Sequence, residues 1–234
     1  MLSIKAYASG STGNMYTLSD GAATIMLDCG LPVRKIQQLL GFKLPDAALV
    51  THEHMDHAKA VKDLQRLGIE TYMTRGTARA LDSWGHRTNI VEDGHSYKIT
   101  DRIKASVFRT EHDVNEPCGF LVEDNADRVL YATDTYFLHY KFPYLTKIMI
   151  EANYSYKILA DNVKNGSLHP AQQRRLMHSH FGIENVLDFL KANDLSWLKE
   201  IWLIHLSKGN ADPAEFKRMV AAATGKPVYI AGGD

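Results

Sequence analysis

The chain has 234 residues, of which 45% are apolar, and its 27 basic and 27 acidic side chains balance to a formal net charge of zero. This size and composition suit one large or two small globular domains. A neutral chain is not expected to coat nucleic acid non-specifically, although a local basic groove is compatible with it. The N-terminal residues lack the basic and apolar segments of a signal peptide, and no apolar window approaches the length of a membrane span, so we expect neither export nor a membrane anchor.

The first half of the chain predicts short strands that alternate with turns and helices. Residues 2–8 alternate between apolar and polar side chains, and a glycine-rich turn follows at 9–14. Pro32 opens a helix that Gly41 closes, and apolar residues at helical spacing predict a second helix that ends at Gly68. The predicted strands are 2–8, 15–18, 23–27 and 47–50, and the predicted helices are 32–40, 58–67 and 77–84.

The second half predicts a hairpin and then a series of helices. Residues 124–127 form a turn between two apolar runs, and Asp212 begins a helix with the capping-box pattern. The predicted helices are near 153–164, 170–177 and 183–192, and the predicted strands are 103–107, 120–122, 129–131, 201–204 and 227–230. Because strands precede helices in both halves, we expect two sheets face to face with helices outside.

Residues 52–57 read His52-Glu53-His54-Met55-Asp56-His57 and follow the apolar run 47–50. The site is therefore expected at the C-terminal end of a buried strand, where α/β folds place their ligands. Imidazole and carboxylate are the ligands that zinc, manganese and iron(II) prefer. His52 and His54 can close on one ion, and Asp56 and His57 can reach a second ion about 3.5–4 Å away, as in two-metal hydrolases. The alternative is a solvated, histidine-rich turn.

Four side chains cannot saturate two ions, so other segments must supply further ligands. His112, Asp134 and His205 each end an apolar run in the same way as the hexapeptide does. A buried polar side chain at such a position is costly unless something binds it. A single histidine there is more often structural, but three such positions in a chain that needs three more ligands favour a metal site.

The two cysteines, Cys29 and Cys118, are too few for a disulfide framework. We expect them to be reduced, semi-buried thiols, which indicates a cytoplasmic protein. A single thiolate ligand to a metal remains an alternative.

The succession His-x-His-x-Asp-His, then a later His, an Asp and a last His, resembles the metallo-β-lactamase superfamily over essentially the whole chain. The resemblance implies an α+β fold, a four-layer αββα sandwich of two mixed sheets face to face with helices outside, as a single domain over residues 1–234. The implied ligands are His52, His54 and His112 for one ion, Asp56, His57 and His205 for the second, and Asp134 as the bridge. Asp28 matches an early aspartate that supports the loop without binding metal. Zinc is the expected metal, with manganese or iron as alternatives, because these ligands suit all three.

Shorter motifs resemble one branch of that superfamily, the YycJ-type (WalJ-type) proteins. The motifs are the turn at 9–14, Glu151-Ala152-Asn153, Ser179-His180 and Ile204-His205-Leu206-Ser207. The branch lies near the ribonuclease Z-like phosphodiesterases and is associated with exonuclease activity on DNA. This chain has His180-Phe181-Gly182 where the branch usually has His-Leu-Ser, so a hydroxyl expected to contact phosphate is lost.

The implied activity is that of a dinuclear metal-dependent phosphodiesterase or nuclease acting on DNA, with a metal-bridging hydroxide as nucleophile. Asp56 is expected to orient the hydroxide as well as to bind metal. His180, just before the predicted helix 183–192, is the candidate for protonating the leaving alkoxide, and its alternative is an exposed histidine without a chemical role. The competing functions are a small-molecule ester, thioester or lactone hydrolase with the same metals, and a redox or structural iron site.

A basic stretch in the third quarter of the chain favours a DNA substrate. Its cations are Lys141, Lys147, Lys157, Lys164, Arg174 and Arg175, and the aromatic residues among them are Tyr136, Phe137, Tyr140, Tyr144, Tyr154 and Tyr156. Aromatic rings beside cations can stack bases, whereas the alternative is a solvated helix face over core aromatics. We predict that Arg174 and Arg175 bind substrate, together with Asn14 and Asn153 from the branch motifs. The sequence leaves the oligomeric state open.

Overall fold

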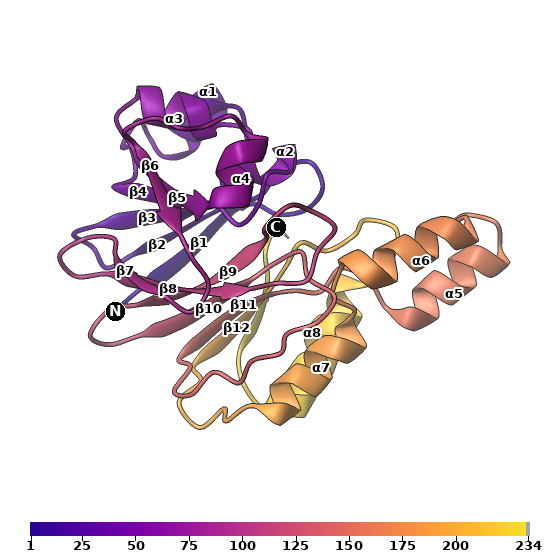
Figure 1. The fold of residues 1–234 in the computed structure, drawn as a ribbon. Helices are drawn as coiled ribbons and strands as arrows, with labels where there is room; N and C mark the ends of the chain where they lie inside the picture. Colours follow the sequence, from indigo (N-terminus) through magenta and orange to yellow (C-terminus); the bar gives the residue numbers. More distant parts are fainter. Residues whose placement is uncertain (233–234) are drawn as a thin grey trace. The chain divides into compact units, whose positions relative to one another are not determined.

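A computed structural model describes residues 1–232 of the chain (Figure 1). These residues divide into two compact units. The first unit comprises Met1–Arg109 and Val114–Asp127, and the second comprises Thr110–Asp113 and the chain from Arg128 onward. Within the described residues the strands belong to two mixed sheets, of six and seven strands. The expectation of a single domain over 1–234 stays a prediction.

The first unit contains the whole six-stranded sheet, in which neighbours follow chain order. Its strands are β1 (Ser3–Ala8), β2 (Met15–Ser19), β3 (Thr24–Leu27), β4 (Ala47–Leu49), β5 (Glu70–Thr74) and β6 (Thr88–Val91). The pairs from β1 to β3 are antiparallel, and those from β3 to β6 are parallel. Parallel neighbours need crossover connections. Helices provide them here: α1 (Val33–Leu39), α2 (Met55–Ala58), α3 (Val61–Arg66) and α4 (Arg75–Ala80).

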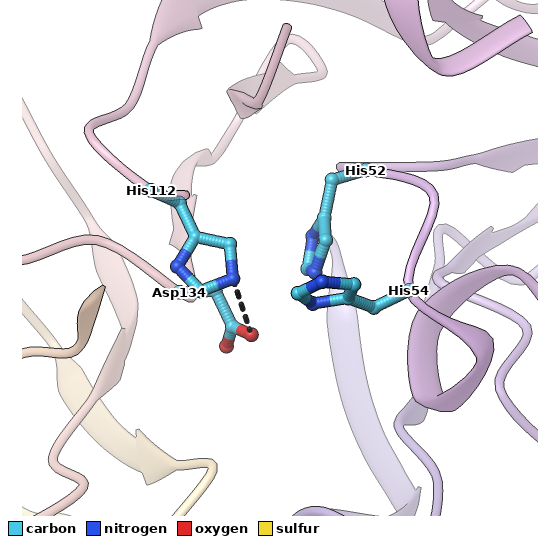
Figure 2. Close-up of side chains that lie close together, drawn as sticks. All are labelled: His52, His54, His112 and Asp134. Atoms are coloured by element: carbon cyan, nitrogen blue, oxygen red, sulfur yellow. Dashed lines mark ion pairs between the residues drawn. The ribbon is translucent and has the colours of Figure 1, made fainter. Parts of the chain in front are cut away.

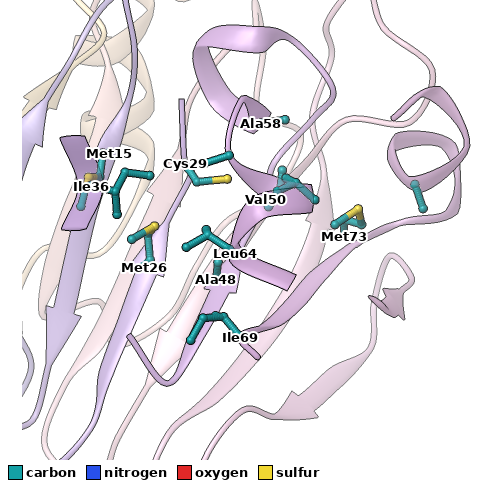
Figure 3. Close-up of a cluster of buried hydrophobic side chains, with 13 residues drawn as sticks. Met15, Met26, Cys29, Ile36, Ala48, Val50, Ala58, Leu64, Ile69 and Met73 are labelled. Carbon is teal, nitrogen blue, oxygen red and sulfur yellow. The ribbon is translucent and has the colours of Figure 1, made fainter. Parts of the chain in front are cut away.

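The same unit carries three antiparallel strands of the seven-stranded sheet, β7 (Ser96–Lys98), β8 (Lys104–Arg109) and β9 (Cys118–Glu123). Between the six-stranded sheet and its helices lies an apolar cluster (Figure 3). Met26, Ile36 and Leu64 are completely buried in it, because α1 and α3 each turn an apolar stripe toward the sheet. This packing holds the end of β4 in place.

The second unit contributes the strands β10 (Arg128–Ala132), β11 (Lys147–Glu151), β12 (Glu200–Ile204) and β13 (Val228–Ile230), which pair in parallel in this order. Its helices are α5 (Tyr156–Lys164), α6 (Pro170–Ser179), α7 (Ile183–Ala192) and α8 (Pro213–Thr224). Figure 1 shows α7 beside α8, whereas α5 and α6 form a helical hairpin that extends away from them. The register pairs Ala132 with Ile150 and Glu151 with Ile204, so the residues after β10 and β12 emerge at one sheet edge with Glu151.

The predicted strands and the helices of the last third are present, but several boundaries differ. The helix expected at 58–67 is two short helices, and α2 already begins at Met55, inside the hexapeptide. The helix expected at 77–84 is α4, which begins earlier because the Thr74 side chain caps it by accepting from Thr77 N. Strand β11 was not predicted, because its apolar core is only Ile148-Met149-Ile150 between two charged residues. Within the described residues no helix is long and apolar enough to cross a membrane.

Candidate functional site

The loop after β4 presents the first group of predicted ligands. His52 and His54 lie on this loop, and their imidazoles project from it in Figure 2, with ring centroids 4.8 Å apart. Asp56 and His57 lie in α2, and the helical turn brings the ring of His57 back to within 4.3 Å of the ring of His52. His52 and His57 are both almost completely buried. Polar rings in contact at such depth are typical of a ligand site rather than of a solvated turn.

A buried hydrogen-bond network orients two of these imidazoles. Asp28 Oδ2 lies 2.7 Å from His57 Nδ1 and accepts from it, while Asp28 Oδ1 accepts from the backbone N of Thr51 at 2.9 Å. The Thr51 hydroxyl lies 3.0 Å from Nδ1 of His52. Nδ1 of both rings is therefore engaged by oxygen atoms of the same unit, so a metal would be coordinated through Nε2, which in His57 faces Asn14 Nδ2. This agrees with the supporting role that the resemblance implies for Asp28.

Backbone contacts fix the position of α2 relative to the start of the chain. Asn14 N donates to Asp56 O at 2.7 Å, and a Cβ on Gly30 would lie only 1.7 Å from that oxygen. Asn14 itself is completely buried, and its Nδ2 lies 3.0 Å from His57 Nε2 and 3.4 Å from Asp56 Oδ2. Asn14 thus joins the glycine-rich turn, where Gly10 N donates to its Oδ1, to α2, and its predicted binding of substrate stays a prediction.

Three predicted site residues share an unusual backbone conformation at strand ends. Asp28 after β3, Asp134 after β10 and His205 after β12 have φ values of 54°, 47° and 52°. Side-chain-bearing residues rarely adopt this left-handed region, although Asp and His do so more readily than most. Such strain tends to persist where a functional geometry requires it. In the second unit it directs Asp134 and His205 off the ends of their strands, and His205 Nδ1 lies 3.2 Å from Asp134 Oδ1.

Glu151, at the end of β11, is the residue that organises the second unit's part of the site. Its Oε1 accepts from Nδ1 of His180 at 2.7 Å and from Nδ1 of His205 at 2.9 Å. Its Oε2 accepts from the backbone N of Thr135 at 3.2 Å and of Phe181 at 3.1 Å. Burial opposes ionisation, but the charge of His180 and the hydrogen bonds from His180 and His205 outweigh it, so the pKa of Glu151 lies below its usual value.

Glu151 belongs to one of the motifs that resemble the YycJ-type branch, but the sequence alone gives it no role. The available signal was its position: it ends an apolar run, as Asp134 and His205 do. That signal was hidden because β11 itself was not recognised as a strand.

His112 and His180 complete this group. His112 Nδ1 donates to the carbonyl of Ser179 at 2.8 Å, and its Nε2 lies 3.7 Å from Asp134 Oδ2, the ion pair dashed in Figure 2. Burial lowers the pKa of His112 despite the nearby Asp134. His180 stacks on His205 with centroids 5.5 Å apart; burial opposes its charge, but Glu151 prevails and raises the pKa of His180. Nδ1 of each ring is thus held by an oxygen of the same unit.

A side-chain cluster within the second unit can hold a cation. The ligand atoms of Asp134, Glu151, His180 and His205 lie within 4.8 Å of one another. Around a protein-bound transition metal, the Nδ1 atom of each ligating imidazole is usually held by a carboxylate, hydroxyl or carbonyl oxygen. The donor set therefore fits a divalent metal such as zinc, and it also fits manganese or iron.

The predicted substrate-binding residues lie in different surroundings. Asn153 is buried, and its Nδ2 donates to the carbonyl of His205 at 3.0 Å. This hydrogen bond holds the backbone of a predicted metal ligand in place. Arg174 and Arg175 are exposed on α6, and Arg175 forms an ion pair of 3.5 Å with Asp113. For these residues substrate binding stays a prediction.

Two members of the predicted basic and aromatic stretch do not belong to it. Lys147 is buried in β11 and pairs with Glu200 at 2.8 Å, and Tyr154 is completely buried. The charge pattern misled here because a buried lysine at a strand start is indistinguishable by sequence from an exposed one.

Sequence similarity to known proteins shows the family of the chain. A family model described as a beta-lactamase superfamily domain matches residues 23–205. The chain belongs to the beta-lactamase superfamily. Exodeoxyribonuclease WalJ from Streptococcus pneumoniae is 29% identical over 223 residues, which cover 87% of this chain and 81% of that protein. Exodeoxyribonuclease YycJ from Bacillus anthracis is 25% identical over 222 residues with the same coverage.

Among solved structures, the metallo-β-lactamase fold protein YhfI from Bacillus subtilis superposes with a TM-score of 0.73. The match has 14% identity and covers 99% of this chain and 97% of that one. These findings confirm the predicted αββα fold and the YycJ/WalJ-type branch. The chain is a metal-dependent hydrolase of this fold, with His/Asp clusters capable of binding metal ions.

Proposed function

We propose that this hydrolase is an exonuclease-like phosphodiesterase that acts on DNA with two divalent metal ions, zinc being the expected metal. The observation that carries the proposal is the repeated pattern in which Nδ1 of a predicted histidine ligand is held by an oxygen of its own unit. The proposed ligands are His52, His54 and His112 for one ion, Asp56, His57 and His205 for the other, and Asp134 as the bridge. The exodeoxyribonuclease names of WalJ and YycJ support DNA as the substrate.

When bound, two such ions lower the pKa of water to about 7 and neutralise the phosphate oxygens. Side chains of the protein then orient the water and supply a proton. Asp56, besides binding metal, orients the attacking water. His180, held through Nδ1 by Glu151, has Nε2 available to give a proton to the leaving alkoxide as the phosphorus–oxygen bond breaks. Its raised pKa suits this role, because a donor must be protonated before it can act.

The helical hairpin of α5 and α6 supports a polyanionic substrate. Residues 156–179 contain four lysines and arginines but only one acidic residue, in a chain whose net charge is zero. Arg174 and Arg175 lie on the exposed side of α6, whose last residue, Ser179, accepts from His112. Helix α6 thus carries Arg174 and Arg175 and also contacts the predicted ligand His112. We propose that these two arginines guide the DNA backbone.

The proposal includes a cytoplasmic location. Cys29 and Cys118 are both buried and unpaired with each other, and burial raises the pKa of both thiols. Reduced structural thiols of this kind are typical of reducing compartments.

The test is a metal-dependent activity profile combined with elemental analysis of the purified protein. End-labelled single- and double-stranded DNA, RNA, bis-p-nitrophenyl phosphate, a lactone and a glutathione thioester are assayed after metal removal and after adding back zinc, manganese or iron. We expect stepwise DNA digestion and diester hydrolysis that require metal, with two metal equivalents per chain. Hydrolysis of the lactone or thioester without any attack on DNA would overturn the proposal in favour of a small-molecule hydrolase.

A further inference from the structure

A cavity of about 430 Å³ lies in the second unit between the segment that follows Asp134 and helix α7. Aromatic side chains form much of its lining: Phe137, Tyr140, Phe181 and Phe189. Phe181 and Phe189 are buried, whereas Phe137 is 49% exposed. A cavity lined by buried rings and by an accessible ring at the surface can take a flat, apolar-faced molecule.

Phe142, which directly follows the lining segment, braces the cavity from behind its walls. Its ring lies 6.0 Å from that of Tyr140 and 6.3 Å from that of Phe189, both lining residues, measured between centroids. Asn193, at the end of α7, accepts from the backbone N of Phe142 at 2.9 Å and so ties the loop to the helix. The cavity is therefore held open by the fold, which lowers the cost of ordering it around a ligand.

Its polar groups suit a neutral heterocycle better than an anion. Asn185, on the lining, accepts from the Tyr156 hydroxyl through Oδ1 at 3.1 Å, while its Nδ2 makes a long contact of 3.5 Å to Tyr136 O and is the group that can turn to a ligand. The charged lining residues Lys141 and Asp188 have opposite signs, so the cavity has no excess of positive charge with which to hold a phosphate. Ring faces for stacking and an amide for an edge are what a nucleobase requires.

The cavity and the predicted chemistry share one anchor. Thr135 and Phe181 both donate backbone N–H groups to Glu151 Oε2, while His180 and His205 are bound to Oε1 of the same carboxylate. Phe181 directly follows His180, and Phe137 is three residues from Asp134, within about 11 Å along an extended chain. The carboxylate that positions the histidines thus also positions two walls of the cavity.

We propose that this cavity binds one unpaired nucleobase of the substrate, the base of the nucleotide beside the phosphate that is cleaved. The inference rests on the proposed function and deepens it. A base must leave the duplex to enter such a cavity, so single-stranded ends are the preferred substrates. Stacking accepts every base, so little sequence preference follows.

Binding is measured first, with metal removed by EDTA so that no turnover occurs. Oligonucleotides carrying the fluorescent base 2-aminopurine at either end are titrated with the wild-type protein, Phe137→Ala and Tyr229→Ala. Tyr229 is the matched control because it is an aromatic residue of the second unit, is 42% exposed and stacks on Trp202 instead of lining the cavity. We expect the wild type and Tyr229→Ala to quench the fluorescence at one end, and Phe137→Ala to bind that end about tenfold more weakly. Equal affinities for all three proteins would overturn the proposal.

Hydrolysis gives an independent readout. DNA whose terminal nucleotide lacks its base is compared with intact DNA, and the wild type is expected to digest the intact end about tenfold faster, a preference that Phe137→Ala loses. If the wild type digests DNA but cleaves intact and abasic termini at the same rate, the cavity is not a base site although the proposed function stands. If DNA is not digested but Phe137→Ala still loses 2-aminopurine binding, the base site stands and the proposed function fails.

Discussion

Nδ1 of His57 lies 2.7 Å from Oδ2 of Asp28, and both side chains are completely buried. The carboxylate also accepts from the backbone and hydroxyl of Thr51, whose hydroxyl contacts His52. One buried aspartate at the end of β3 thereby sets the tautomer and orientation of two predicted metal ligands on the loop after β4. The same logic recurs in the second unit, where Glu151 holds His180 and His205.

Replacing Asp28 by Asn tests this orientation. The amide cannot accept from both Thr51 and His57 as the carboxylate does, so the proton of His57 is free to move to Nε2, which then cannot coordinate. We expect metal affinity to fall about 10- to 100-fold. Metal titration and elemental analysis after dialysis measure the loss. Asp63→Asn, on the exposed face of α3, is the control with the same change of charge, and equal losses in both variants would contradict the role of Asp28.

Gly30→Ala tests the close approach of α2 to the residues after β3. A Cβ there would lie 1.7 Å from Asp56 O and 2.8 Å from Asn14 N, so the backbone on one side must shift. We expect destabilisation of about 1–3 kcal/mol, as for other overpacked sites, and a loss of metal because Asp56 and His57 move together. Thermal unfolding and metal content measure both effects. Gly209→Ala, where nothing lies within 4 Å of the added Cβ, is expected to behave as the wild type.

Asp134→Ala and Asp134→Gly form a pair that separates ligand loss from backbone strain. Both variants lack the carboxylate, so both are expected to lose turnover and metal. They differ because Asp134 has φ of 47°, which alanine tolerates poorly and glycine readily. In metal-free protein we expect the glycine variant to be more stable than the alanine variant by about 1 kcal/mol. Denaturant unfolding measures the difference, and retained activity in either variant would show that the bridge is misassigned.

Glu151→Gln tests proton donation by His180. Glutamine keeps the shape of the side chain but replaces one acceptor oxygen by a donor, so it cannot hold His180, His205 and both backbone N–H groups at once. We expect a larger fall in kcat for DNA, whose leaving alkoxide needs a proton, than for bis-p-nitrophenyl phosphate, whose leaving group does not. Glu184→Gln, which affects a carboxylate bound to Ser155 and Tyr156, serves as the control. Equal losses on the two substrates would refute donation by His180.

Replacing Arg174 and Arg175 together by alanine tests the helical hairpin. Lost phosphate contacts are expected to weaken binding of long DNA and to reduce its dependence on salt by about one unit of log–log slope per contact, without affecting a small diester. Lys217→Ala with Arg218→Ala on α8 removes the same charge elsewhere on the second unit. Kd values across a salt series compare the two double variants, and an identical slope for both would exclude a specific role of the hairpin.

Much of the site could be predicted from local pattern. His52, Asp56 and His57 lie in one hexapeptide after an apolar run, and Asp134 and His205 each follow a strand. A polar residue that follows a buried apolar run marks the end of a strand, so the positions of these residues could be predicted. The helices α6 and α7 were expected near their observed bounds because their apolar spacing and caps are local features. The superfamily that these motifs resemble is confirmed as the family of the chain, whereas the ligand assignments stay predictions.

The remaining features depend on neighbours that are distant in the sequence. Lys147 looks like a surface cation until Glu200, 53 residues later, is found to pair with it inside the sheet. Glu151 ends a strand too short in apolar residues to be recognised, and its function arises from partners that approach it from other segments.

The sequence by itself determined which residues are the predicted ligands, the strand-end positions that carry them and the family to which the chain belongs, because these depend on residues close together along the chain. Only the tertiary structure decided that Asp28 and Glu151 hold the histidines by Nδ1, that Asn14 is buried, and that aromatic residues beyond Asp134 enclose a cavity with α7. Those features are set by parallel strand register and by burial, which bring together groups separated by tens of residues, and no short-range pattern records them.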